Sequence, residues 1–354
     1  MDLLRHLGLS VPIIQAPMAG VSTPRLAAAV SNAGGLGSIA VGATDAPGAR
    51  QMIEATRAET NRAFQVNVFV HPAARADPAR EAAWLDALRP QFERFGAAPP
   101  TSLRALYRSF GEDEAMVDAL VDLAPPVVSF HFGLPTRDRI EALKAVGCTL
   151  FATATNLREA RAAEAAGIDV LVAQGFEAGG HRGMVDLEAE DEALGTLALT
   201  RLLAAKSTLP VIAAGGIMDG AGIRAVLDLG AVAAQLGTAF IACPESSADA
   251  GYRAALGRAA ETGTVMTQAI SGRPARCLVN DFTRWGQGAV PPIPDYPIAY
   301  DAGKALNAAA KAAGEAGYGA QWAGQGASLS RAMPAAELIA TLHAELLETR
   351  SAPA

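Results

Sequence analysis

The sequence predicts an α/β fold: a (β/α)8 barrel of the TIM type, with a second, smaller domain inserted after strand eight. Eight short apolar or β-branched runs recur between residues 13 and 238, and Ala-rich stretches with helical periodicity separate most of them. Several runs begin roughly 20–28 residues apart, the length of one strand, one helix and two short loops. Strands that alternate with helices form a parallel sheet, and eight can close into a barrel. An open, doubly wound sheet is the alternative.

The expected strands are short, and each ends at Gly, Pro or a polar residue. In chain order they are Ile13–Met18, Leu36–Ala40, Phe64–Phe69, Val127–Gly133, Thr149–Thr155, Val170–Gly175, Val211–Gly215 and Ala233–Thr238. Helical stretches between them have apolar residues three and four positions apart and a Gly directly after their ends. Examples are Pro24–Ala33, Arg137–Val146, Leu157–Ala166 and Gly220–Leu229. Gly stops a helix there because it adopts the left-handed conformation at little cost.

The chain changes character after strand eight. Residues 241–297 are rich in Gly, Pro and Arg and lack clear alternation. We therefore expect residues 1–240 to form the barrel, helices within residues 305–350 to complete it, and residues 241–304 to form a smaller lid domain at its mouth. Four more stretches have a helical pattern: Asp77–Phe95, Glu112–Leu123, Ile298–Ala313 and Ala335–Thr349.

Composition and charge exclude several classes of protein. The chain has 354 residues, of which 51% are apolar and 18% charged, so it can bury a large core and is not a disordered chain. Its net charge of −7 and its lack of a basic patch argue against a nucleic-acid partner. No apolar run approaches the roughly 18 residues of a membrane span, and we identify no signal peptide. Three scattered cysteines predict neither disulfides nor a metal site, so we expect a cytoplasmic protein.

Polar residues occupy the inward positions near the ends of three expected strands. Side chains alternate along a strand, so one parity faces the lumen of a barrel and the other faces the helices. The residues expected to face the lumen are Gln65, Asn67, Ser129, His131 and Gln174, whereas Val128, Phe130 and Phe132 are among those expected to face the helices. A buried polar group without a partner costs about 1–3 kcal/mol. The convergence of these inward-facing polar side chains therefore predicts a polar ligand, and a hydrated barrel mouth is the alternative.

Glycines follow strands seven and eight. Strand seven runs into Gly215 and Gly216, and strand eight ends in the run Gln235–Thr238. Glycine lets backbone N–H groups approach an anion, and the N-terminus of the next helix adds partial positive charge. Loops at these places are the recurrent phosphate site of the barrel, so we predict a phosphorylated ligand. A dinucleotide fingerprint at Gly220 is rejected because it lies inside the helix and no acidic residue ends the following strand.

The loop after strand six carries one histidine among four glycines, between Gly175 and Gly183. Such a backbone can lie flat against a planar ligand, and His181 projects from a loop and not from a packed apolar face. Imidazole, with a reference pKa of roughly 6.5, accepts or donates a proton at neutral pH. We therefore predict a chemical role for His181, with a loop-bracing hydrogen bond as the alternative. The other histidines outside the strand ends, His6, His71 and His343, are expected at the surface.

A lysine and two tyrosines are expected on one helix face at the rim of the site. Tyr296, Tyr300 and Lys304 stand four residues apart across Pro297, which suits the first turn of a helix. Together they can hold a small anion. The alternative is a solvated lysine beside half-buried tyrosines.

Four motifs follow one another along the chain, Gln15–Pro24, His131–Pro135, Gly175–Gly183 and Gln235–Phe240. Together they resemble the nitronate monooxygenase family, formerly called 2-nitropropane dioxygenases, and most closely its class I bacterial members. The resemblance covers nearly the whole chain and implies FMN as the cofactor. It implies FMN contacts from Met18, Asn67, Gln174, Gly179, Gly180, Gly216, Gln235, Leu236, Gly237 and Thr238. It also implies that His181 is catalytic and that His131, Tyr296, Tyr300 and Lys304 lie on the substrate side.

The expected reaction is oxidation of an alkyl nitronate, such as propionate 3-nitronate, with O2 to a carbonyl product and nitrite. An FMN-dependent NAD(P)H:quinone or enoyl-thioester reductase of the same fold is the alternative enzyme, and a non-catalytic flavin-binding module is a third interpretation. The expected partners are a small-molecule nitronate and O2. The sequence leaves the oligomeric state open, a homodimer included.

Overall fold

Eight parallel strands form the closed ring at the centre of the molecule. The structure is a computed structural model that describes residues 2–348. The ring strands are β1 (Ile13–Gln15), β2 (Gly37–Ala40), β3 (Phe64–Phe69), β4 (Val127–His131), β5 (Thr149–Ala154), β6 (Val170–Gln174), β8 (Val211–Ala214) and β9 (Ala233–Leu236). All eight lie within one residue of the starts expected from the sequence. Their order, β1-β9-β8-β6-β5-β4-β3-β2, is that of a parallel barrel.

Backbone hydrogen bonds between β1 and Leu36, the residue directly before β2, close the ring. Gln15 N donates to Leu36 O at 2.9 Å, and Leu36 N donates to Ile13 O at 3.0 Å. Closure leaves no free sheet edge, and it distinguishes the barrel from the doubly wound alternative. The predicted (β/α)8 fold is therefore confirmed, and the carboxyl ends of all eight strands meet at one mouth.

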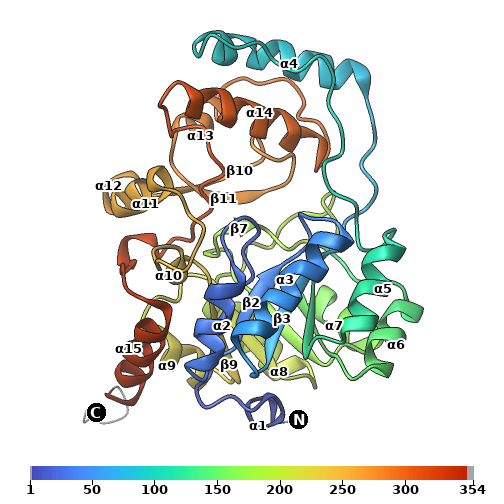
Figure 1. Cartoon of the computed structure of the whole chain (residues 1–354), viewed down its shortest axis with the longest axis vertical. Coiled ribbons are helices and arrows are strands. Elements are labelled where there is room, and N and C mark those ends of the chain that lie inside the picture. Colours follow the sequence, from blue (N-terminus) through green and yellow to red (C-terminus); the bar gives the residue numbers. More distant parts are fainter. Residues whose placement is uncertain (1, 349–354) are drawn as a thin grey trace.

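Helices surround the barrel and cover its apolar outer surface (Figure 1). They are α2 (Pro24–Asn32), α3 (Ala46–Glu59), α5 (Glu114–Leu123), α6 (Arg137–Ala145), α7 (Leu157–Ala166), α8 (Thr196–Lys206), α9 (Gly220–Asp228) and α15 (Ala335–Glu348), while α1 (Leu3–Leu7) lies at the N-terminus. Local signals set their ends. The Asn156 side chain accepts from Glu159 N to start α7, and Gly167, with φ of 87°, ends it.

The interior of the barrel follows the predicted alternation, with one exception. Val66, Phe130 and Leu171 are fully buried on the helix side. Phe132 was expected there too, and that prediction is wrong. β4 ends at His131, Phe132 turns to a positive φ of 77°, and its ring packs against Phe69 instead. The alternation no longer applies once the strand has ended.

A second layer, here called the lid layer, covers the barrel mouth (Figure 1). It contains α4 (Pro78–Glu93), α11 (Ala250–Gly257), α12 (Ala259–Thr262), α13 (Asp281–Gly286), α14 (Ile298–Ala312) and an antiparallel sheet of β7 (Gly180–His181), β10 (Thr264–Thr267) and β11 (Ala275–Leu278). Between it and the barrel lie α10 (Thr238–Ile241) and the 3-10 turn η1 (Ala327–Leu329). The short strand β7 belongs to the barrel loop after β6, but it pairs with β11 of the lid layer. This pairing joins the two layers.

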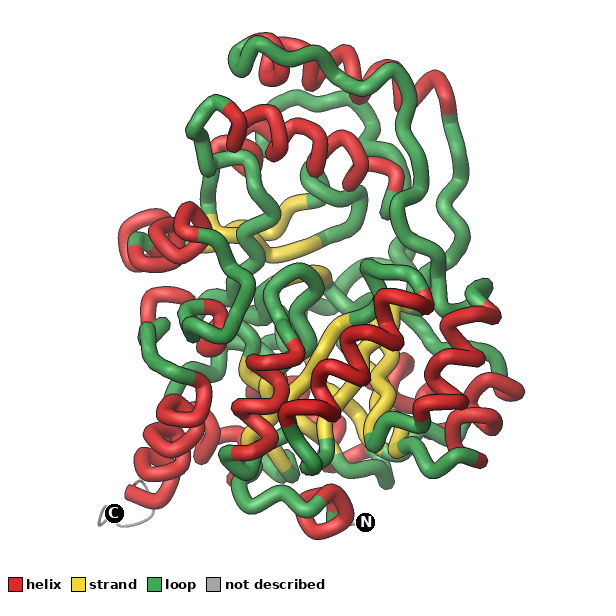
Figure 2. The backbone as a smooth tube through the Cα atoms, viewed as in Figure 1, coloured by secondary structure: helices red, strands yellow, loops and turns green. Residues whose placement is uncertain are grey.

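The lid layer draws on two distant parts of the chain. Two loop segments connect α4 to β3 and α5 of the barrel (Figure 2). Trp84 and Leu88 of α4 are fully buried in one cluster with Leu306 of α14, and removal of a large buried side chain from such a cluster costs about 3–5 kcal/mol. The boundary expected at residue 304 falls inside α14, and residues 349 and 350 lie outside the described part. Within residues 2–348, no helix is long and apolar enough to cross a membrane.

Candidate active site

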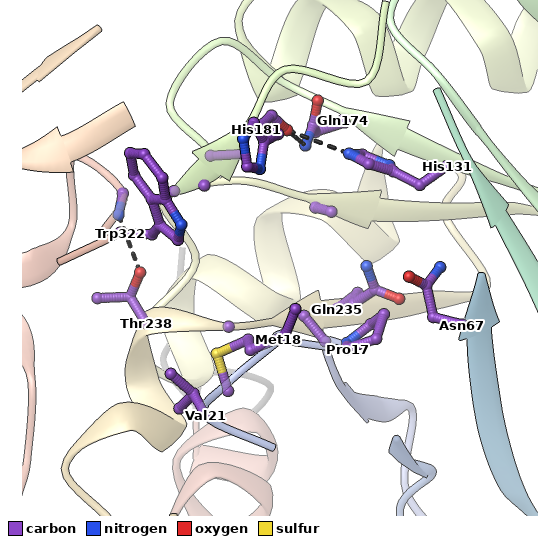
Figure 3. A pocket seen from close by; sticks show the side chains of 18 of the residues that line it. Pro17, Met18, Val21, Asn67, His131, Gln174, His181, Gln235, Thr238 and Trp322 are labelled. Atoms are coloured by element: carbon purple, nitrogen blue, oxygen red, sulfur yellow. Dashed lines mark hydrogen bonds between the residues drawn. The ribbon is translucent and has the colours of Figure 1, made fainter. Parts of the chain in front are cut away.

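A cavity of about 370 Å³ opens between the barrel mouth and the lid layer. That volume lies within the roughly 300–1,000 Å³ of small-molecule and cofactor sites. Every residue that the sequence analysis assigned to the site lines it: Met18, Asn67, His131, Gln174, Gly179, Gly180, His181, Gly215, Gly216, Gln235, Leu236, Gly237, Thr238, Tyr296, Tyr300 and Lys304. In Figure 3, His181, Gln174 and His131 lie along one side, and Met18, Pro17 and Gln235 lie along the opposite side.

The inward polar residues of β3 and β4 hydrogen-bond to one another beneath the cavity. Gln65 Nε2 and Asn67 Nδ2 each donate to Ser129 Oγ at 2.9 Å. All three side chains are buried, as the strand alternation predicts. Mutual bonding satisfies the two amide nitrogens and holds the three side chains together before any ligand binds, while Gln65 Oε1 is buried without a partner among the described residues.

The backbone carbonyl of His181 accepts two hydrogen bonds from barrel side chains. Gln174 Nε2 donates to it at 3.0 Å, and His131 Nε2 donates at 3.2 Å (Figure 3). Gln174 Oε1 also accepts from Gly183 N at 2.7 Å. These contacts fix the loop after β6 over the barrel, and they fix the backbone from which the His181 ring projects.

Both ring nitrogens of His131 are engaged by the protein. Nε2 faces the His181 carbonyl, which can only accept, so Nε2 carries the proton. Nδ1 lies 2.9 Å from Thr153 Oγ1 and therefore accepts from that hydroxyl when the ring is neutral. Burial, with smaller contributions from the charges of Arg273 and Arg182, lowers the pKa of His131 to about 4, so the ring is neutral at physiological pH.

His181 is also neutral. Burial first, and then the neighbouring His131 and the positive charge of Arg273, hold the pKa of His181 well below its ordinary value. Arg273 is itself fully buried, with its guanidinium carbon 4.1 Å from the centre of the Phe132 ring and one nitrogen donating to Met184 O. A buried guanidinium stays charged, so a fixed positive charge lies behind the histidines.

The glycines of the site allow neighbouring backbone segments to approach one another closely. A Cβ on Gly179 would lie 2.5 Å from the backbone of Ala323 and Gly324, so the loop after β6 can touch that segment only as glycine. Gly215 and Gly216 turn at φ of 128° and 68°, conformations that favour glycine. The predicted glycine turn after the seventh ring strand, β8, therefore exists, and both this turn and the run Gln235–Thr238 at the end of β9 line the cavity.

The positive end of helix α9 is already occupied by protein carboxylates. Asp219 accepts from Gly222 N at 2.8 Å, and Glu345, reaching across from α15, accepts from Gly220 N at 2.9 Å. We expected the N-terminus of this helix to contribute to an anion site. These carboxylates take its first amides, so any anion here would depend on the glycine turns instead.

Aromatic rings and one lysine form the lid side of the cavity. Tyr296 and Tyr300 pack against His181, with ring centroids 5.3 Å and 6.2 Å from the imidazole. Lys304 Nζ lies 5.5 Å from the Tyr300 ring and 5.0 Å from the Tyr107 ring. Among residues 2–348, no carboxylate forms an ion pair with Lys304, so its charge is available at the rim. Tyr300 and Lys304 share α14, as predicted, but the helix begins at Ile298, so Tyr296 lies before it and the expected face of three residues is wrong at that position.

Sequence reasoning missed several residues of the site. Tyr107 reaches the cavity from the loop between α4 and α5, where no periodicity marks it. Trp322 packs 5.1 Å from His181, and the Gly-rich run around it was a usable signal. The prediction that His71 lies at the surface is wrong. It is buried edge-on against Tyr296 at 5.1 Å, because the loop after β3 turns under the lid layer.

Comparison with known proteins gives the family. A family model described as nitronate monooxygenase matches residues 2–345. The chain is 61% identical over 348 residues to the nitronate monooxygenase of Paraburkholderia phytofirmans, covering 98% of this chain and 95% of that protein. It is 57% identical over 343 residues to that of Pseudomonas aeruginosa, covering 97% and 98%. The chain belongs to the nitronate monooxygenase family.

Solved structures agree with this family, whose members are oxidoreductases. The nitronate monooxygenase fold described here matches a nitroalkane oxidase from Streptomyces ansochromogenes with a TM-score of 0.90 and 42% identity, covering 99% of both chains. It also matches FabK from Thermotoga maritima with a TM-score of 0.73 and 29% identity, covering 99% of this chain and 96% of that one. The barrel and the lid layer are therefore both shared with solved enzymes.

Proposed function

We propose that this chain uses FMN to oxidise alkyl nitronates, such as propionate 3-nitronate, with O2 to a carbonyl product and nitrite. The observation that carries the proposal is the neutral imidazole of His181 at the wall of a cavity that is otherwise lined by glycine turns and aromatic rings. A glycine-lined slot suits a planar ring with a phosphate tail. An imidazole beside it suits a hydrogen bond to the nitro oxygens of a nitronate, or removal of a proton from the carbon of a neutral nitroalkane.

Two features of the cavity fit FMN. Gln235 Oε1 is buried without a hydrogen-bond partner among the described residues, so a ring N–H in the cavity would satisfy it. At Gly237, an added Cβ would lie 3.4 Å from Ala16 Cβ and 3.7 Å from Met18 Sδ, so a side chain would fill space that is left open.

The residues that would hold FMN lie at both ends of this slot. Gly216, Gly237 and Thr238 would hold the phosphate through backbone amides, and Asn67, Gln174 and Gln235 would contact the ring. When bound, FMN supplies the electron acceptor and the reaction with O2.

The protein's own groups bind and orient the substrate. The ammonium of Lys304 and the hydroxyl of Tyr300 are suited to a carboxylate such as that of propionate 3-nitronate. The rings of Phe132, Tyr296 and Trp322 surround His181 and limit the access of water to it. His181 holds or moves one proton at the reacting end of the substrate.

Replacing His181 with Asn tests the proposal. We expect kcat/KM with propionate 3-nitronate to fall by about 10²–10⁴, the usual contribution of a positioned acid–base group, while FMN content stays at the wild-type level. His343→Asn on α15, far from the cavity, is the matched control and should leave both quantities unchanged. Wild-type turnover by the His181→Asn protein would overturn the proposed role.

The alternative, an NAD(P)H-dependent reductase of the same fold, gives a different result. Anaerobic mixing with NADH should bleach the flavin rapidly in a reductase and only slowly in a nitronate oxidase. Rapid bleaching, together with no oxygen uptake on addition of propionate 3-nitronate, would favour the reductase.

A further inference from the structure

The His181 ring has one polar contact within the described residues. Four aromatic rings surround it, Phe132, Tyr296, Tyr300 and Trp322, at centroid distances of 5.1–6.2 Å. Its Nε2 atom lies 2.9 Å from the hydroxyl of Ser271, a fully buried residue in the loop before β11. Nδ1 has no protein partner among residues 2–348, and the ring lines the cavity. The two nitrogens of this imidazole therefore have different surroundings.

The direction of the Ser271 hydrogen bond follows from what its neighbours can accept. The hydroxyl has a single proton. Ser271 Oγ lies 3.2 Å from the carbonyl oxygen of Arg273, which can only accept and has no other partner among the described residues. If the hydroxyl donates to that carbonyl, its lone pairs must receive the remaining donors. These are Arg273 N, at 3.4 Å, and the Nε2–H of His181.

A neutral imidazole carries one proton, so placing it on Nε2 leaves Nδ1 with a lone pair. His131 provides an internal comparison. It is also protonated on Nε2, but its Nδ1 is used by Thr153. Of the two histidines of the cavity, His181 alone keeps a ring nitrogen without a protein partner in the described part of the chain.

We propose that Ser271 is a positioning residue that fixes His181 in the Nε2–H tautomer, so that Nδ1 faces the substrate as a proton acceptor. This inference rests on the catalytic role proposed for His181. Nδ1 can take a proton from the acidic carbon of a nitroalkane, whose C–H bonding electrons remain on the substrate as the nitronate. Once protonated, the same atom donates to a nitronate oxygen. In both states the Nε2–H bond to Ser271 is kept, so the ring does not rotate during the reaction.

The tautomer is measured directly, without turnover. Long-range ¹H–¹⁵N correlation spectra of the purified protein, labelled with ¹⁵N-histidine, distinguish protonated from unprotonated ring nitrogens. The His181→Asn protein identifies the His181 signals by their absence. We expect a single tautomer in which Nε2 carries the proton at neutral pH. A proton on Nδ1, or a fully protonated ring, in the wild-type protein would overturn the proposal.

Ser271→Ala tests whether the hydroxyl sets this state. We expect the His181 signals to show exchange between tautomers, kcat/KM with a neutral nitroalkane to fall about tenfold to hundredfold, and the pH profile of kcat/KM to shift. The matched control is Ser31→Ala. Ser31 is equally buried and donates to a backbone carbonyl, Ala63 O, at 2.8 Å, but lies at the opposite end of the barrel. An unchanged tautomer and an unchanged pH profile in Ser271→Ala would overturn the proposal.

Two further measurements keep the outcomes separate. If Ser271→Ala fails to fold, the wild-type spectrum still decides the tautomer, and Ser271→Cys keeps side-chain volume with a weaker hydrogen-bonding group and should give an intermediate loss. If His181→Asn retains full turnover with propionate 3-nitronate, the catalytic role of His181 fails, and this proposal fails with it. If the wild-type protein shows no turnover with any nitronate or nitroalkane but has the expected tautomer, the proposed function fails and the hydrogen bond by which Ser271 sets the tautomer stands.

Discussion

The two walls of the cavity are built in different ways. The barrel wall, which includes Asn67, His131, Gln174 and the glycine turns, consists of groups fixed by strand hydrogen bonds and by one another. The lid wall, formed by Tyr107, Tyr296, Tyr300 and Lys304, is held by ring packing between separate segments. The difference indicates a division of labour. A preorganised polar wall suits a permanently bound cofactor, and an aromatic wall with one free charge suits a small anionic substrate.

Substitution of Gly179 is the strongest test of the barrel wall. In Gly179→Ala the new Cβ would lie 2.5 Å from backbone atoms of Ala323 and Gly324, which cannot move aside as a flexible side chain could. We expect a loss of stability of about 1–3 kcal/mol from this overpacking and a large fall in FMN content. Urea unfolding and the visible absorbance of the purified protein measure the two effects.

Gly257→Ala is the matched control for that substitution. Nothing lies within 4 Å of the Cβ position of Gly257, at the end of α11, so stability and FMN content should match the wild type. Full FMN content in Gly179→Ala would show that the barrel wall is more adaptable than its backbone contacts imply.

Acidic pH should lower the free energy of unfolding through protonation of His131, a residue of the barrel wall. The unfolded ring has a pKa of roughly 6.5, and burial lowers the pKa of the folded ring to about 4. Between about pH 6.5 and about pH 4 the unfolded state therefore binds more protons than the folded state. As a result, the free energy of unfolding falls as the pH drops from about 6.5 to about 4. Below about pH 4 this group changes the free energy of unfolding no further. One group contributes at most about 1.4 kcal/mol per pH unit.

His131→Gln isolates this contribution, because Gln can still donate to the His181 carbonyl but does not titrate. We expect the free energy of unfolding to fall less steeply between pH 6.5 and 4.5 in the variant than in the wild type. His181, whose pKa is also lowered by burial, keeps part of the slope in both proteins. Equal slopes in the two proteins would mean that His131 is not neutral in the folded state.

The barrel wall was predictable from sequence, and most of the lid wall was not, for a physical reason. Period-two alternation and glycine stops place Asn67, His131 and Gln174 at strand ends without knowledge of other segments. Tyr107 enters the cavity because α4 packs on α14, more than 200 residues later, and nothing local records that contact. Tyr300 and Lys304 were found because they share a helix face.

Local patterns failed in the same way wherever a strand or helix had ended. Phe132 lies one residue beyond β4, and its orientation is set by packing against Phe69 and not by alternation. Ser271 and Arg273 lie in a loop whose place behind His181 depends on the pairing of β11 with β7. The residues that tune the histidine therefore come from contacts that no sequence window contains.

The lid wall should affect substrate binding more than cofactor binding. In Lys304→Met the exposed ammonium is lost while most of the side-chain bulk is kept. We expect KM for propionate 3-nitronate to rise about threefold to tenfold, with kcat and FMN content nearly unchanged, because a solvent-exposed charge contributes only modestly. Lys311→Met is the control on the same helix, since Lys311 pairs with Asp249 away from the cavity and should leave KM unchanged. A loss of FMN in Lys304→Met would contradict the division between the walls.

The smallest expected effect concerns the contact, here called the tether, between Arg104 in the loop that carries Tyr107 and Asp301 of α14. Arg104 N donates to Asp301 Oδ2 at 3.1 Å, and the Arg104 side chain lies 3.9 Å from the same carboxylate while remaining largely exposed. In Asp301→Asn the amide oxygen still accepts the backbone bond, so only a weak ion pair is lost. We expect stability to change by under about 0.5 kcal/mol and KM to change by less than about twofold.

The comparison of Asp301→Asn with Asp86→Asn shows whether the tether matters to the site. Asp86 forms an exposed pair with Arg89 on α4, so its loss should change neither quantity. A KM that rises severalfold in Asp301→Asn alone would show that Tyr107 needs a fixed loop to form the lid wall. In that case ring packing would not suffice to hold this wall, and the two walls would resemble each other more than their contacts indicate.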